Sequence, residues 1–177
     1  MERHIAFLRG VNVSGQKIVK MEQLRKVVSD AGFFNVKTYI QSGNLLFDTD
    51  ETETANLIVM IENLIETAFG FRTDIILRRL ADIEVIVNSP FFSQLKSDDE
   101  KKYYITFLKT GYTASIDLPL FSRNKDVEIF ICNGMEMFSV CAPHKGVFGF
   151  PNAFVEKITG TPATTRNPLT LIKLLEL

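Results

Sequence analysis

Hydrophobic residues between positions 5 and 79 follow an order that few folds can accommodate. Short apolar runs of this kind favour buried strands, and apolar residues at helical spacing favour amphipathic helices. The runs at 5–8, 36–40, 45–47 and 72–79 are strand-like, and the segments 21–31 and 57–69 have helical spacing. The resulting order, β-α-β-β-α-β, is that of the ferredoxin-like plait, in which two helices cover one face of an antiparallel sheet.

The second half of the sequence resembles a partial repeat of the first. It is predicted to contain a helix at 81–88, strands at 103–108, 127–132 and 135–141, and helices at 152–159 and from 168 onward. Asn133-Gly134 predicts a tight hairpin turn, Asn152 and Asn167 are candidate helix caps, and Leu118–Ser122 is either a short helix or irregular. We therefore predict an α+β fold of two ferredoxin-like units packed together, 1–80 and 81–177, with an additional C-terminal helix.

Composition restricts the functional classes. The 177 residues carry a net charge of −1, so any nucleic-acid binding would need a local basic patch. No run approaches the roughly 18 apolar residues of a membrane span, and the N-terminus lacks the layout of a signal peptide. Cys132 and Cys141 lie in strand patterns and are expected to be buried free thiols. These features predict a cytoplasmic protein with no membrane association.

Polar residues cluster after the first two predicted strands. In the plait these two strands point the same way, so the loop 9–20 and the turn 41–44 should meet at one end of the sheet, where the fourth strand also begins. A helix starting near Met21 would direct its unpaired N–H groups toward the same region. We therefore predict a binding site for a small anionic or phosphorylated ligand. Its candidate residues are Arg9, Asn12, Lys17, Gln41, Ser42 and Asn44, with Ser14, Lys20 and Arg72 nearby.

A second polar cluster precedes the last helix. Thr164–Asn167 is predicted to be a loop in which Arg166 and Asn167 could hold phosphate or carboxylate. Whether this loop reaches the first site is left open. The simpler alternative for both clusters is structural, with the asparagines satisfying turn hydrogen bonds and the basic side chains extending into water.

Known catalytic and metal-binding motifs are not matched. Gly10-x4-Gly15 departs from a phosphate-binding P-loop, because Lys17 is one position late and Ile18 replaces the hydroxyl residue. His4 and His144 lack the partners of a zinc site, and Ser42 lacks a nucleophile-elbow pattern. We predict no metal and no cofactor, and no catalytic residue can be assigned.

Four sequence blocks resemble a known family. They are Arg9-Gly-Val-Asn-Val-Ser-Gly, Val19-Lys-Met, Thr38-Tyr-Ile-Gln-Ser-Gly-Asn and Ala163-Thr-Thr-Arg-Asn. In this order they are similar to the bacterial family catalogued as domain of unknown function 1697. The resemblance implies a tandem pair of alpha-beta plaits with no assigned activity. The family pattern often has glycine at Ser14 and an aromatic residue at Pro168.

Three functional hypotheses follow. The first is a binding protein or enzyme for a small anionic ligand at the loops 9–20 and 41–44. The second is nucleic-acid phosphate binding by the same loops, which salt-dependent retention would reveal. The third is a protein-interaction module with no ligand, which would show an exposed apolar patch. The sequence does not decide the oligomeric state.

Overall fold

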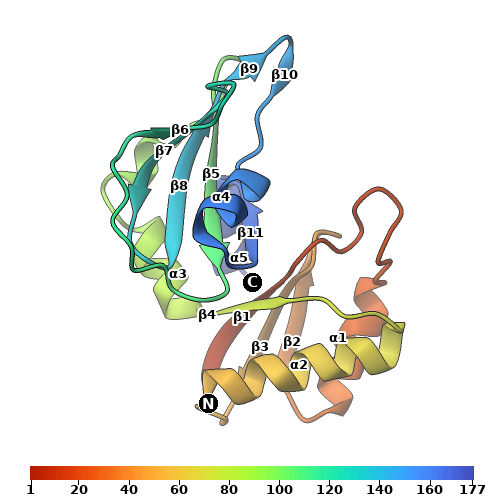
Figure 1. Cartoon of the computed structure of the whole chain (residues 1–177). Coiled ribbons are helices and arrows are strands. Elements are labelled where there is room, and N and C mark those ends of the chain that lie inside the picture. Colours follow the sequence, from red (N-terminus) through yellow and green to blue (C-terminus); the bar gives the residue numbers. More distant parts are fainter. The chain divides into compact units, whose positions relative to one another are not determined.

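A computed structural model describes residues 1–177 and shows an α+β protein with five α-helices and antiparallel sheets (Figure 1). The chain forms two compact units, residues 1–85 with 173–177 and residues 86–172. The units divide between Val85 and Ile86, within helix α3 (Leu80–Val87), and the boundary near Leu80 stays a prediction.

The first unit contains a four-stranded antiparallel sheet in the order β2-β3-β1-β4 (Figure 1). Its elements are β1 (Glu2–Leu8), α1 (Met21–Asp30), β2 (Phe34–Tyr39), β3 (Asn44–Thr49), α2 (Thr54–Phe69) and β4 (Ile75–Arg79). The central strand β1 aligns His4 with Phe47 of β3 on one side and Arg79 of β4 on the other. This order of elements along the chain is the predicted one.

Helices α1 and α2 form the core of the first unit together with one face of the sheet. Leu24 of α1 and Leu57 and Ile61 of α2 are fully buried in one cluster with Ala6 and Leu8 of β1. Alternate residues of a strand face the same side of a sheet, so Ala6 and Leu8 share the helix-covered face. Gly70 ends α2 in the left-handed conformation, as the sequence predicts.

The second unit contains a five-stranded antiparallel sheet in the order β11-β5-β8-β7-β6. Its strands are β5 (Lys102–Leu108), β6 (Leu120–Phe121), β7 (Val127–Cys132), β8 (Glu136–Cys141) and β11 (Ala163–Arg166), with a separate hairpin of β9 (Pro143–His144) and β10 (Val147–Phe148). Helices α4 (Asn152–Thr159) and α5 (Pro168–Leu175) follow the hairpin, and a 3-10 turn (Phe92–Gln94) precedes β5. Val155 of α4 packs on Leu108 and Met137 of the sheet.

The two sheets share a strand order. Without the two-residue edge strand β6 and the separate β9–β10 hairpin, β5, β7, β8 and β11 are the first to fourth strands of the second unit. Their order in the sheet, β7-β8-β5-β11, then repeats the order β2-β3-β1-β4 of the first unit. The second unit has no helix between β5 and β7, where the chain forms irregular structure and the two-residue strand β6.

Several local predictions were correct. The hairpin at Asn133-Gly134 connects β7 to β8, and Asn133 Oδ1 accepts the backbone N–H of Glu136 at 2.7 Å. Asn167 caps α5, since its Oδ1 accepts the N–H of Thr170 at 2.8 Å.

Two local predictions were wrong, and a third was correct only in part. Thr164–Asn167 is not a loop, because Ala163–Arg166 pairs with β5 as strand β11. The threonine hydroxyls find partners there: Thr165 Oγ1 lies 2.9 Å from Thr106 Oγ1. Asn152 does not cap α4, because its Oδ1 instead accepts the hydroxyl of Thr165. Leu118–Ser122, predicted to be a short helix or irregular, is irregular except for Leu120–Phe121, which forms strand β6 and pairs with β7.

Both cysteines are free thiols, as predicted, but only Cys141 is fully buried, whereas Cys132 is half-buried. Burial, with a smaller effect of Asp126, raises the pKa of the Cys141 thiol to about 12. None of the helices combines the length and hydrophobicity needed to cross a lipid bilayer.

Candidate functional site

Three connections of the first unit meet at one end of its sheet. β1 and β2 both run antiparallel to β3, so they point the same way and their following loops share an end. The N–H of Arg9 donates to the carbonyl of Asp74 at 3.0 Å, and the amide of Asn12 donates to the carbonyl of Gln41 at 2.8 Å. We call this region the loop rim, made of residues 9–20, 40–44 and 72–74.

Asn12 connects two loops of the rim. Its Nδ2 donates to the carbonyls of Val19, at 3.0 Å, and Gln41, at 2.8 Å. Its Oδ1 accepts the N–H of Val19 at 2.9 Å. Both N–H bonds of the amide are therefore used inside the protein. Through these bonds Asn12 connects the two ends of the loop 9–20 and links this loop to the β2–β3 turn. Its role is therefore to stabilise the positions of the side chains that could contact a ligand.

Asn44 has a similar role in the neighbouring turn. It is fully buried at the start of β3, and its Nδ2 donates to the carbonyl of Tyr39 at 3.0 Å and to Ser42 Oγ at 2.9 Å. The Ser42 hydroxyl is thereby fixed at the tip of the turn, while the side chain of Gln41 is exposed. Of these three predicted residues, Gln41 and Ser42 lie nearer to solvent.

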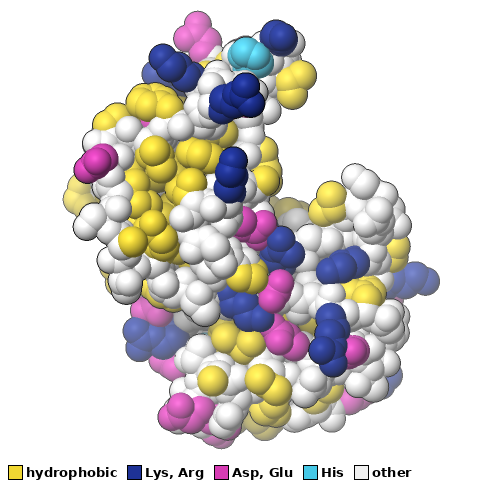
Figure 2. All heavy atoms as spheres, in the orientation of Figure 1, with side chains coloured by type: hydrophobic (Ala, Val, Ile, Leu, Met, Phe, Trp, Pro, Cys, Tyr) yellow, Lys and Arg dark blue, Asp and Glu magenta, His cyan; other side chains and the backbone are white.

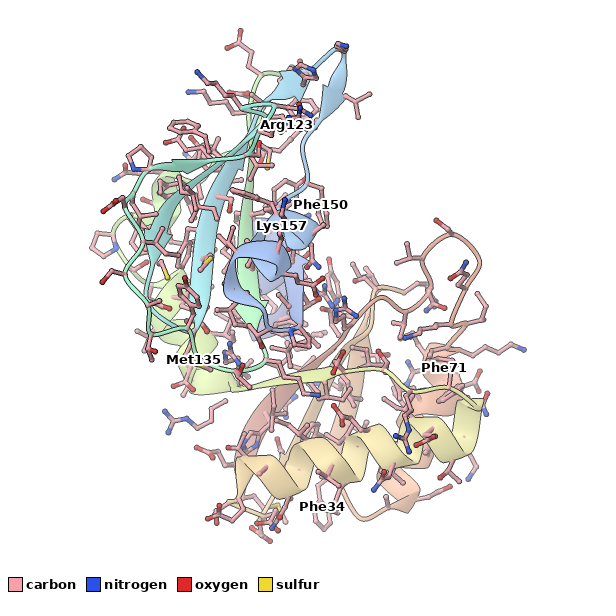
Figure 3. The ribbon with its side chains drawn as sticks, viewed as in Figure 1. Phe34, Phe71, Arg123, Met135, Phe150 and Lys157 are labelled. Carbon is pink, nitrogen blue, oxygen red and sulfur yellow. The ribbon has the colours of Figure 1, made fainter.

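Lys17 is an exposed cation of the rim that is held by two contacts to the segment after α2. Its Nζ donates to the carbonyl of Arg72 at 2.8 Å and lies 5.8 Å from the centre of the Phe71 ring. Figure 3 shows Phe71 just after the end of α2. An ammonium group has three N–H donors, and this bond uses one of them. A cation held in this way by a carbonyl and a ring needs little reorganisation to bind an anion.

Acidic side chains accompany the rim cations. Arg9 Nη1 lies 3.7 Å from Asp74 Oδ2, and Arg72 Nε lies 2.8 Å from Glu66 Oε1. The hydrogen bond to Glu66 raises the pKa of the Arg72 guanidinium. A polar hollow of about 260 Å³ beside Lys17 is lined by the carboxylates Glu62, Glu66 and Asp74. The positive charge of the rim is therefore largely matched.

The rim also carries exposed aliphatic side chains. Val13, Ile18 and Ile40 are each more than half exposed on the two loops. Ile40 also adopts a positive φ of 49°, which a β-branched residue rarely does. Helix α1 begins directly after the rim with Lys20 as its N-cap, and no side chain caps its first turn.

The comparisons with known proteins identify the family. Residues 1–138 match the family described as "Protein of unknown function (DUF1697)". The chain belongs to the DUF1697 family. This confirms the resemblance predicted from the four sequence blocks, and the family description assigns no activity.

One solved structure similar to this DUF1697 protein is that of a conserved bacterial protein from Streptococcus pneumoniae. It shares 23% sequence identity, with 97% of this chain and 96% of that chain covered, and the TM-score is 0.66. At this identity the likeness concerns the fold alone. No curated protein matches the sequence.

The other two predicted site residues of the DUF1697 protein, Arg166 and Asn167, belong to its second unit. Arg166 ends β11, and its Nη1 donates to Thr164 Oγ1 at 2.7 Å and to the carbonyl of Thr165 at 2.9 Å. Burial lowers the pKa of the Arg166 guanidinium to about 10. The Asn167 side chain is engaged in capping α5. The structure thus brings together Arg9, Asn12, Lys17, Gln41, Ser42 and Asn44 within the first unit.

The carboxylates beside the rim cations were not predicted from the sequence. Glu62 and Glu66 are four residues apart near the end of α2, so they share one face of that helix. The helix precedes β4, whose start was predicted at the rim, so the carboxylates could have been placed there from the sequence. No three His, Cys, Asp or Glu side chains come together as metal ligands would.

Proposed function

We propose that this DUF1697 protein binds a small anionic ligand, such as a phosphate ester, at the loop rim. The single observation that carries the proposal is the position of Lys17, whose Nζ is held by the Arg72 carbonyl with two N–H donors remaining. Lys17 and Arg9 would neutralise charge, and Gln41 and Ser42 would orient the ligand. Asn12 and Asn44 would hold the loops that present these groups.

The rim carboxylates limit the expected affinity. Glu66 and Asp74 lie next to cations of the rim, so an incoming anion must compete with them. Salt also weakens the interactions between exposed charges, with a screening length of roughly 10 Å at 0.1 M ionic strength. We therefore expect modest binding that weakens as salt is added.

Calorimetry on the full chain would test the proposal with inorganic phosphate, AMP and glucose 6-phosphate as probes. At least one probe should bind, and Lys17→Ala should reduce its affinity severalfold. Lys26→Ala is the matched control, because Lys26 is an exposed lysine of α1 outside the rim. Equal responses of both variants, or no binding of any probe by the wild type, would overturn the proposal.

A second candidate function is a protein-interaction surface at the same rim. It is favoured by Val13, Ile18 and Ile40, aliphatic side chains that are 58%, 56% and 52% exposed. In this case Ile18→Asp would abolish partner binding, while Lys17→Ala would leave it largely intact. Pull-down experiments with both variants would distinguish the two candidates.

Nucleic-acid binding by the rim has weaker support. On the visible face of the first unit, basic and acidic side chains are interspersed, with no large area of one charge (Figure 2). Phosphate backbones require a concentrated basic surface, and binding to them weakens steeply with salt. Salt-dependent retention of the protein on single-stranded DNA or RNA would support this alternative.

The proposed architecture is two ferredoxin-like units. The repeated strand order of the two sheets supports this proposal. The first unit also has both helices of the plait, whereas the second lacks the helix between β5 and β7. A cytoplasmic location remains part of the proposal, and it is supported by the two free cysteines.

A further inference from the structure

The second unit carries an apolar hollow of about 560 Å³ that the proposed function does not use. It lies where the start of β5, the 3-10 turn at 92–94 and the first turns of α5 meet. Its volume falls within the roughly 300–1,000 Å³ typical of small-molecule sites. We call it the β5–α5 hollow.

The hollow forms because β11 is shorter than β5. β11 pairs only with Ile105–Leu108, so residues 102–104 have no strand beside them on that edge. The Ser97 hydroxyl accepts the N–H of Tyr103 at 2.9 Å instead. The chain then turns into α5 directly after β11, which places Pro168 and Leu169 along the opposite wall.

The walls of the hollow are largely apolar and aromatic. Phe92 and Leu95 are buried beneath it, whereas Leu169 is 72% exposed. Tyr104 contributes a wall held edge-to-face against Phe150, with ring centres 5.3 Å apart. Figure 3 shows Phe150 beside helix α4. Such rigid rings offer contact area with little loss of conformational freedom on binding.

Charged residues of the hollow have one sign. Lys96 and Lys102 line it, and no Asp or Glu does. Lys102 Nζ donates to the carbonyl of Asp98 at 2.5 Å and lies 5.2 Å from the centre of the Phe148 ring. The Asp98 carboxylate accepts backbone N–H groups of its own loop, which lowers its pKa. The first turn of α5 adds partial positive charge.

Apolar walls together with two lysines favour a ligand that has an apolar part and a negative charge. An apolar body would bury the exposed part of Leu169 against the tyrosines, and a negative group would meet the lysines. The loop rim differs, because three carboxylates stand beside its cations. We propose that the β5–α5 hollow is a second binding site, for a small organic anion with an aromatic body and one carboxylate, sulfonate or phosphate group.

The test uses 1-anilinonaphthalene-8-sulfonate, an aromatic sulfonate whose fluorescence rises in apolar sites. Titrated into the full native chain, it should show saturable enhancement that weakens with added salt. Leu169→Glu places a like charge in the hollow and should weaken binding about tenfold or more. Lys96→Gln should weaken it severalfold.

Val147→Glu is the matched control. Val147 is 71% exposed in the same unit and does not line the hollow, so this variant should bind as the wild type does. Near-UV circular dichroism would establish that each variant keeps its tertiary packing, since this probe also binds partly unfolded chains. Absence of enhancement in the wild type, or equal binding by Leu169→Glu and Val147→Glu, would overturn the proposal. Lys17→Ala should leave this signal unchanged, which separates the result from that of the loop rim.

Discussion

The side-chain amide of Asn12 donates to the main-chain carbonyl of Gln41, 2.8 Å away and 29 positions later in the sequence. This bond joins the loop after β1 to the turn after β2. It therefore determines the shape of the loop rim from which Lys17 and Gln41 extend.

Replacing Asn12 with alanine should lower the free energy of unfolding by about 2 kcal/mol. The substitution removes three hydrogen bonds and puts alanine at a φ of 55°, which is unfavourable by roughly 1 kcal/mol. Urea denaturation followed by circular dichroism would measure the change. Asn12→Gly tolerates this φ and should fall between the alanine variant and the wild type. A loss below roughly 0.5 kcal/mol in Asn12→Ala would contradict the bracing role.

Gly43→Ala should be considerably more destabilising than Gly15→Ala. Both glycines have nearly the same φ, +75° and +74°, but a Cβ at Gly43 would lie 2.6 Å from Val11 Cγ2 and 2.8 Å from Leu8 Cβ. At Gly15 nothing lies within 4 Å. We expect a loss of about 1 kcal/mol for Gly15→Ala from φ alone, and about 3 kcal/mol for Gly43→Ala from the added clash. Thermal unfolding of the two variants would measure both losses of stability, and their difference gives the cost of the steric clash at Gly43. Equal losses would contradict this prediction, because they would mean that the turn moves away from β1 to accommodate the added Cβ.

Ile40→Asn should stabilise the protein by about 1 kcal/mol, because asparagine tolerates a positive φ better than a β-branched residue. Ile40 has a φ of 49° and is 52% exposed, so little apolar burial is lost. Ile18→Asn is the control, since Ile18 is similarly exposed, at 56%, but has no positive φ. Chemical denaturation should show a gain for the first variant only. A loss in Ile40→Asn would mean that its side chain packs on the rim more than its exposure suggests.

Cys141 should resist alkylation in the native protein, whereas Cys132 should react. Cys141 is buried, and its thiol has a pKa raised to about 12, while Cys132 is half-buried. Mass spectrometry after iodoacetamide treatment of Cys132→Ala and Cys141→Ala would compare the two thiols. Labelling of Cys141 without denaturant would contradict the structure.

The raised pKa of the Cys141 thiol should make the free energy of unfolding depend on pH in the alkaline range. Its folded pKa lies above the usual value of about 9, so the unfolded chain loses this proton first as the pH rises. This contribution is fully present below pH ~9 and should decline as the pH rises toward ~12. Cys141→Ala should lack this part of the alkaline loss. Identical alkaline profiles for wild type and variant would rule out the contribution.

Two local sequence signals predicted local structure correctly, whereas the cap predicted at Asn152 was wrong. Asn133-Gly134 forms a hairpin and Asn167 caps α5, because each depends on residues within a few positions. Thr164 and Thr165 were predicted to be loop residues, yet they form β11. Their partner strand lies about sixty positions earlier, and Thr165 meets Thr106 across 59 residues. No local pattern records such a pairing.

The sequence by itself determined the order of strands and helices in the first unit and the end of its sheet where the polar loops meet. Hydrophobic periodicity and chain direction suffice for both, since each follows from the alternation of side chains along the backbone. Only the tertiary structure decided that the amides of Asn12 and Asn44 face inward and that carboxylates of α2 stand beside Lys17. It also decided that β11 stops short of the first residues of β5, which opens the β5–α5 hollow. These outcomes depend on side-chain direction and on the relative lengths of distant strands, which are fixed only when the packed elements compete for the same hydrogen bonds and space.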